Sequence, residues 1–108
     1  MEKESLVKFI EENKEAVFYL PTIVLVEFLA YKKLDERTSH LFEEFLKDIV
    51  VINLDIEIAR MAAKIRRIYN LKTIDAVVAA SAIITNSTLI TYNLKDFKRI
   101  KELKVVAP

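Results

Sequence analysis

The chain has 108 residues, of which 53% are hydrophobic and 31% are charged, and its formal net charge is +1. These values predict one folded domain over residues 1–108 and exclude an extended disordered chain. The absence of cysteine and the single histidine exclude disulfides, thiolate zinc sites and multi-histidine metal sites, and the absence of glycine excludes glycine-rich phosphate loops.

The sequence also argues against a membrane protein. No apolar run reaches the roughly 20 residues that a membrane-spanning helix needs. The first residues, MEKESLVKF, are too charged for a secretory signal. We therefore expect a cytoplasmic protein without membrane association. Because the net charge is close to zero, binding to nucleic acid would need a local basic patch or a metal ion.

The first half of the sequence predicts helices that alternate with short apolar strands. An amphipathic helix is predicted over Lys3–Lys14, followed by a buried strand in the run AVFYLP, which Pro21 ends. Thr22 can cap the next helix, which should reach about Leu34. A third amphipathic helix is predicted over Thr38–Lys47. The β-branched run IVVINL after it is typical of a strand buried on both faces.

The second half continues the same alternation. Asp55 stands where the N-cap of a helix over Ile56–Tyr69 belongs, and Thr73 is expected to cap the alanine-rich helix after it. STLITYN predicts a third strand, LKDFKRI a helical turn, and LKVVAP a last strand. Apolar strands that alternate with helices predict an α/β fold, a short parallel sheet flanked by helices.

Three carboxylates are expected near the strand ends, where parallel sheets collect their chemistry. Glu27 follows the first strand by about two helical turns, Asp75 lies in the first turn of the alanine-rich helix, and Asp96 follows the third strand together with Asn93. Oxygen ligands of this kind suit Mg²⁺ or Mn²⁺. The pattern is compatible with a hard-cation site.

Each of these acids also has a structural interpretation. Glu27 has apolar neighbours three and four residues away on its helix, so it either binds a cation, forms an ion pair or lies at the edge of the helix face. Asp75 can interact with the helix dipole alone. Asn93 and Asp96 have the spacing of a capping box, and Thr91 can face a neighbouring strand.

The basic residues near the end of the chain are also open to two interpretations. Lys98 and Arg99 follow the helical turn directly, and Lys95 lies within it. They can line a channel for a phosphate backbone, or they can form an ordinary solvated helix face.

Two segments resemble motifs of PIN-domain proteins, especially the VapC-type toxin ribonucleases. TIDAVVAASAIITNSTLITYNLKDFKRI is similar to the C-terminal half of that family, in which an Asp opens an alanine-rich helix that leads to an LITxN strand and a DF turn. LPTIVLVEFLAY is similar to the family motif in which a helix carries a glutamate. The two motifs come in the family's order, and the resemblance extends over nearly the whole chain.

The resemblance implies a function and a set of site residues. Glu27, Asp75 and Asp96 match the metal-binding acids of the family, and Asn93 and Thr91 match the polar positions beside the last one. It implies Mg²⁺- or Mn²⁺-dependent cleavage of single-stranded RNA, in which Asn93 would assist the metal-binding acids through a water. We expect Thr91, Lys95, Lys98 and Arg99 to be the RNA contacts. The resemblance also implies a homodimer that a partner antitoxin inhibits.

One part of the family pattern does not occur in the sequence. The family's central strand, which ends in Asp-Thr-Asn and provides the first metal ligand, has no counterpart in the 108 residues. Its loss would leave two strands with unpaired backbone groups facing each other. Three explanations are open at this point: a truncated start, direct pairing of the two neighbouring strands, or a strand from another chain in the gap. The alternative function is therefore a non-catalytic binding or assembly module with a degraded metal site.

Overall fold

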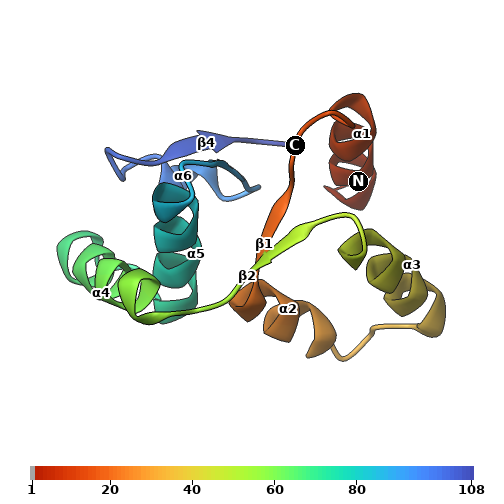
Figure 1. Cartoon of the computed structure of the whole chain (residues 1–108), viewed down its shortest axis with the longest axis horizontal. Helices are drawn as coiled ribbons and strands as arrows, with labels where there is room; N and C mark the ends of the chain where they lie inside the picture. Colours follow the sequence, from red (N-terminus) through yellow and green to blue (C-terminus); the bar gives the residue numbers. More distant parts are fainter. Residues whose placement is uncertain (1) are drawn as a thin grey trace.

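A computed structural model describes residues 2–108, with side-chain burial described from Ser5 onward. Helices alternate with strands of three residues each, as Figure 1 shows, which confirms the predicted α/β class. The elements are, in chain order, α1 (Glu2–Glu12), β1 (Tyr19–Pro21), α2 (Thr22–Leu29), α3 (Glu36–Leu46), β2 (Val50–Ile52), α4 (Ile56–Tyr69), α5 (Thr73–Ile84), β3 (Thr88–Ile90), α6 (Leu94–Phe97) and β4 (Lys104–Val106).

The strands form two separate parallel pairs. β1 pairs with β2, with Leu20 opposite Val51, and β3 pairs with β4, with Leu89 opposite Val105. Within residues 2–108 no strand joins the two pairs. The sheet is therefore divided into two halves, and each strand has one edge without a strand partner in the described chain.

The hydrophobic core lies in the second half of the chain. It is built from α4, α5 and the segment that holds α6, and its buried residues are Ile58, Ala62, Ile65, Leu71, Ala76, Val77, Ala79, Ala80, Ala82, Phe97, Ile100 and Leu103. The small side chains of α5 are buried on several sides, which allows α4 to pack closely against it. From the first half, Ile23 and Ile52 pack against this core.

Two asparagines end the core helices in the left-handed conformation. Asn70 follows α4 with φ of 55°, and Asn86 follows α5 with φ of 54°. Glycine usually occupies such positions, and asparagine is the residue that tolerates them next best. In a chain without glycine, these two asparagines allow α4 and α5 to end sharply and the chain to turn.

The first half of the chain is packed more loosely. Neither α2 nor α3 has a fully buried residue, although the rings of Phe28 and Phe42 stack with their centroids 3.8 Å apart. The prediction that β2 is buried on both faces is wrong, since Val50 and Val51 are 46% and 43% exposed. The β-branched composition predicted the strand correctly, but the elements that would cover it are not present on both sides.

Of the predicted helix caps, Asp55 and Asn93 are correct, whereas Thr22 and Thr73 are wrong. The Asp55 carboxylate accepts a hydrogen bond from the Ile58 N–H at 2.9 Å, as an N-cap should. Thr22 and Thr73 do not cap. Each is the first residue of its helix, and Pro21 and Lys72 occupy the N-cap positions without a side-chain cap bond.

Several element boundaries differ from the prediction. α2 ends at Leu29, five residues before the predicted Leu34, while α4 has the predicted bounds. α3 begins at Glu36, because Asp35 caps it by accepting from the Thr38 N–H at 2.7 Å. None of the helices in residues 2–108 combines the length and hydropathy needed to cross a bilayer.

Candidate functional site

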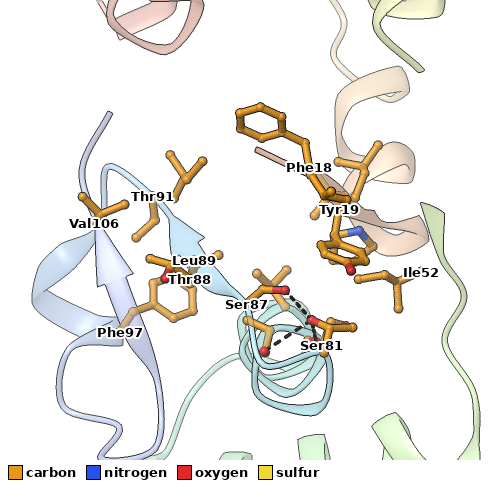
Figure 2. Close-up of a pocket in the computed structure, with 18 of the residues that line it drawn as sticks. Phe18, Tyr19, Ile52, Ser81, Ser87, Thr88, Leu89, Thr91, Phe97 and Val106 are labelled. Carbon is orange, nitrogen blue, oxygen red and sulfur yellow. Dashed lines mark hydrogen bonds between the residues drawn. The ribbon is translucent and has the colours of Figure 1, made fainter. Parts of the chain in front are cut away.

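A groove separates the two strand pairs. Figure 2 shows Thr88 and Leu89 of β3, with Thr91 just after it, on one side, Tyr19 of β1, with Phe18 just before it, on the other, and α5 between and below them. The volume of this space is about 760 Å³. It is open to solvent and is the natural place to look for the predicted site.

The lining of the groove is mostly apolar along its length. β1, β3 and α5, together with the residues next to them, provide most of it, and Phe9 of α1 and Asn13 just after that helix also line it. The ionisable carboxylates among the lining residues are Glu27 and Asp75. The groove therefore combines an apolar space with two acidic groups from different helices.

Glu27 extends from α2 and lines the groove with an exposed side chain. Of the interpretations that the sequence left open, the position at the edge of a helix face fits this exposure best. Within residues 5–108, no basic side chain forms an ion pair with Glu27. An exposed carboxylate without an ion partner is available to a cation.

Asp75 lies in the first turn of α5 and is half-buried at the wall of the groove. Its neighbours Ala76 and Val77 are buried in the core, so the backbone that carries Asp75 is well anchored. The helix dipole favours a negative charge at this place. The structure thus brings Glu27 and Asp75, predicted from separate motifs, to one groove.

Asp96 and Asn93 form the predicted capping box at the start of α6. The Asn93 side-chain amide donates to an Asp96 carboxylate oxygen at 3.0 Å, and the Asp96 N–H donates to the Asn93 side-chain oxygen at 3.4 Å. The Thr91 hydroxyl accepts from the Asn93 N–H at 3.0 Å. Of these three residues, Thr91 lines the groove.

The basic candidates for RNA contact are exposed and do not line the groove, namely Lys95, Lys98 and Arg99. Lys95 belongs to α6 and Lys98 is its C-cap. Arg99 donates from Nη2 to the backbone carbonyl of Tyr69 at 3.0 Å, which links the segment after α6 to the last residue of α4. This bond gives Arg99 a structural contact that the sequence did not indicate.

The oxygen donors are of the right type for a hard cation, but they are not gathered into one cluster. In the part of the chain that is described, no three His, Cys, Asp or Glu residues are close enough to hold a metal ion. Two carboxylates reach the groove, and Asp96 is engaged with Asn93 beside it. Among the described residues, two of the three predicted acids, Glu27 and Asp75, therefore share one groove.

Sequence reasoning did not identify the polar residues at the groove floor. Ser81 donates to the Val77 carbonyl at 2.8 Å, and Thr85 donates to the Ser81 carbonyl at 2.8 Å while contacting the Ser87 hydroxyl at 2.8 Å. These hydroxyls form hydrogen bonds with groups close to them in the sequence, as buried polar groups in an apolar wall need partners. Periodicity alone gives no signal for them, because their partners are backbone atoms one helical turn away.

A family model described as the PIN domain matches residues 2–103 of the chain. The chain belongs to the PIN domain family. This membership confirms the predicted PIN-like fold. Among curated proteins, none matches this sequence.

Solved structures give the same result for the fold. VapBC2 from Rickettsia felis, bound to a DNA fragment from the promoter, is 25% identical with a TM-score of 0.80, covering 96% of this chain and 85% of that chain. DNA-bound VapBC from Salmonella typhimurium is 23% identical with a TM-score of 0.78, covering 96% and 84%. VapBC-1 from nontypeable Haemophilus influenzae is 18% identical with a TM-score of 0.73, covering 95% and 92%. The PIN domain is thus of the VapC type.

Proposed function

We propose that this PIN domain is a metal-dependent endoribonuclease of the toxin–antitoxin type, which cleaves single-stranded RNA in the cytoplasm by means of metal-activated water. The observation that carries the proposal is that Glu27 and Asp75, from α2 and α5, line one groove. Family membership and the similarity to VapBC structures support it.

The acidic residues have distinct roles in this proposal. Glu27 and Asp75 hold Mg²⁺ or Mn²⁺ from the groove wall, and Asp96 adds a third carboxylate. Asn93 fixes the orientation of Asp96 through its 3.0 Å hydrogen bond. When bound, such a cation activates water and stabilises the leaving oxygen of the phosphodiester. Thr91 lies on the wall beside these acids and can donate a hydrogen bond to a phosphate oxygen.

The basic residues would position the RNA rather than react with it. Lys95, Lys98 and Arg99 place three exposed cations within and just after α6, next to Asp96. Exposed cations of this kind contact phosphates independently of base sequence, and their contribution weakens with salt. Because Arg99 also donates to Tyr69, Lys95 and Lys98 are the better residues for testing RNA contact.

We also propose an antitoxin partner and a homodimer. The similar structures from Rickettsia felis and Salmonella typhimurium are VapBC assemblies. In this chain, large apolar side chains are exposed on and near α2 and α3, namely Val26, Leu29, Tyr31 and Leu41, at 46% to 62%. Grouped exposed apolar side chains favour a covering protein.

The test is manganese-dependent cleavage of a generic single-stranded RNA by the wild-type chain and by Asp75→Asn. The proposal expects cleavage that a chelator stops and that falls by at least ~100-fold in the variant, since a lost metal ligand commonly costs that order of rate. Glu102→Gln, an exposed change outside the groove, is the matched control and should cleave like the wild type.

A non-catalytic binding or assembly module is the second candidate, and the lack of a three-residue metal cluster among the described residues favours it. The two functions differ in their response to metal. A metal site should raise the melting temperature by several degrees in millimolar Mn²⁺, because a ligand of the folded state stabilises it. A module without the site should melt at the same temperature with and without Mn²⁺.

A further inference from the structure

The charges of this protein are divided unequally between its two halves. Residues 1–57 contain seven Lys and Arg against thirteen Asp and Glu, whereas residues 58–108 contain ten against three. In Figure 1, α4 and β4, which belong to the basic half, lie on the left, and the acidic helices α1 and α3 lie on the right. The net charge of +1 therefore conceals a strong separation of charge across the molecule.

Five of the basic residues come together at the end of α4. The last turn of this helix carries Arg66 and Arg67. Arg99 donates from Nη2 to the carbonyl of Tyr69, the last residue of the helix, at 3.0 Å, and the Lys101 N–H lies 3.5 Å from the Tyr69 hydroxyl. These contacts hold the segment between α6 and β4 against the helix end. We refer to the five cations of the two segments as the basic face, namely Arg66, Arg67, Lys98, Arg99 and Lys101.

The charge of the basic face is not neutralised within the described chain. All five side chains are exposed, and none of them forms an ion pair within residues 5–108. Of the three acids in residues 58–108, Asp75 lines the groove and Asp96 bonds to Asn93, which leaves Glu102 as the acid next to the face in the sequence. The helix dipole favours cations at this end of α4. The positive charge is therefore available to an anionic partner.

The surroundings of the basic face favour a phosphate backbone over a protein as that partner. The apolar residues beside its cations are mostly buried in the core, namely Ile65, Phe97 and Ile100, while Ile68 is 59% exposed. A protein interface has an apolar centre and is poor in lysine, and one exposed isoleucine does not provide such a centre. A phosphate backbone needs only cations, and the planar guanidinium groups of the three arginines match the geometry of phosphate oxygens.

The basic face lies outside the groove but next to it. None of its five residues lines the groove. The connection runs through α6, because Phe97 at its end lines the groove and Lys98 follows directly. Since phosphates repeat along a whole strand, an RNA longer than the groove carries negative charge beyond it. That charge meets the basic face on one side of α6.

We propose that the basic face binds the phosphate backbone of RNA outside the groove, independently of base sequence. This inference rests on the proposed function for the identity of the RNA as the substrate, but the binding itself requires neither metal nor cleavage. The acidic helices α1 and α3 repel the same backbone. The separation of charge therefore orients the protein toward the RNA as the two approach each other.

The test is the binding of a fluorescein-labelled oligouridylate of about 20 nucleotides to the full chain, followed by fluorescence anisotropy at several salt concentrations. EDTA is present throughout, so that the measurement reports binding without metal-dependent cleavage. The double variant Arg66→Ala/Arg67→Ala removes two cations of the basic face that lie outside α6. The matched control, Lys32→Ala/Lys33→Ala, removes two adjacent exposed lysines from the acidic half.

The proposal expects the arginine variant to bind at least ~10-fold more weakly at low salt, with a slope of log affinity against log salt that is smaller by ~1.4, since each lost phosphate contact removes about 0.7. The lysine control should bind within ~2-fold of the wild type. A second variant of the face, Lys98→Ala/Lys101→Ala, should repeat the loss. Circular dichroism checks that all the variants are folded.

No RNA binding by the folded wild type, or equal losses in the arginine variant and the lysine control, would overturn the proposal. Tighter binding of a poly-glutamate peptide of equal charge would also overturn it, in favour of an acidic protein as the partner. The failure of this proposal differs from that of the proposed function. Manganese-dependent cleavage with unchanged RNA binding in the arginine variant would refute the basic face alone. Binding that the arginine variant loses, without cleavage by the wild type, would refute the ribonuclease alone.

Discussion

The two halves of this PIN domain differ in how their apolar residues are used. From Ile58 to Leu103, α4, α5 and the segment around α6 bury twelve hydrophobic residues in one core. Among residues 5–57 no residue is fully buried, and Val17, Val26 and Tyr31 are more than 60% exposed. The strands and α2 of the first half are no less apolar in composition than the elements of the second half. Within the part of the chain that the structure describes, no element covers those residues fully.

The groove and the loose packing concern the same elements, since β1 and α2 line the groove and belong to the first half. α2 and β2 meet the core through Ile23 and Ile52, while the space between β1 and β3 stays open (Figure 2). A strand in that space would connect the halves by backbone hydrogen bonds and would bury the facing apolar groups. Each 100 Å² of apolar surface so buried would contribute about 2.5 kcal/mol.

The largest expected effect compares one substitution in the two halves. Ile65 in α4 is 3% exposed, whereas Ile10 in α1 is half-buried. Ile65→Ala should lower the free energy of unfolding by ~2–5 kcal/mol, because it leaves a cavity in the core. Ile10→Ala should cost ~1 kcal/mol or less. Urea denaturation measures both, and equal losses would show that the halves are packed alike.

A smaller effect compares two helix caps. Asp55 caps α4 and Asp35 caps α3, through bonds of 2.9 and 2.7 Å. Removing an N-cap typically costs ~1 kcal/mol. Asp55→Ala should show this loss in global unfolding. Asp35→Ala should cause a smaller loss in the free energy of global unfolding, since the first half of the chain can unfold before the core does. Thermal and urea unfolding measure the loss of stability in both variants. A larger loss for Asp35→Ala than for Asp55→Ala would refute the expectation.

The smallest effect concerns Glu27. Because its side chain is exposed and has no ion partner among the described residues, Glu27→Gln should change the metal-free stability by ~0.5 kcal/mol or less. The same variant should reduce any stabilisation by Mn²⁺. A large loss of stability without metal would instead indicate a structural ion pair.

The sequence predicted best those features that depend on nearby residues. The α4 helix has its predicted bounds, Asp55 is its cap, and Asn93 forms the expected capping box with Asp96. Each of these rests on hydrogen bonds between residues three or four positions apart. Glu27 and Asp75, which the family motifs singled out, line one groove, and periodicity could not have shown that they meet.

Features that depend on distant neighbours were predicted less well. IVVINL has the composition of a buried strand, yet Val50 and Val51 are exposed. The prediction was wrong because the sequence does not tell which elements cover β2. Thr22 has a capping side chain, but Pro21 precedes it and fixes the backbone at the N-cap position. The link between Arg99 and Tyr69 spans 30 residues and has no local signal.

Hydrogen exchange of individual amides in the free chain, followed by NMR, tests the central claim most directly. Because backbone groups alternate between the two edges of a strand, Leu20 and Leu89 direct their N–H groups to β2 and β4, whereas Tyr19 and Ile90, which line the groove, direct theirs to the opposite edges. If the groove is open, Tyr19 and Ile90 should exchange much faster than Leu20 and Leu89. Strong protection of Tyr19 and Ile90 in a monomer would mean that β1 and β3 pair directly, and would contradict the account.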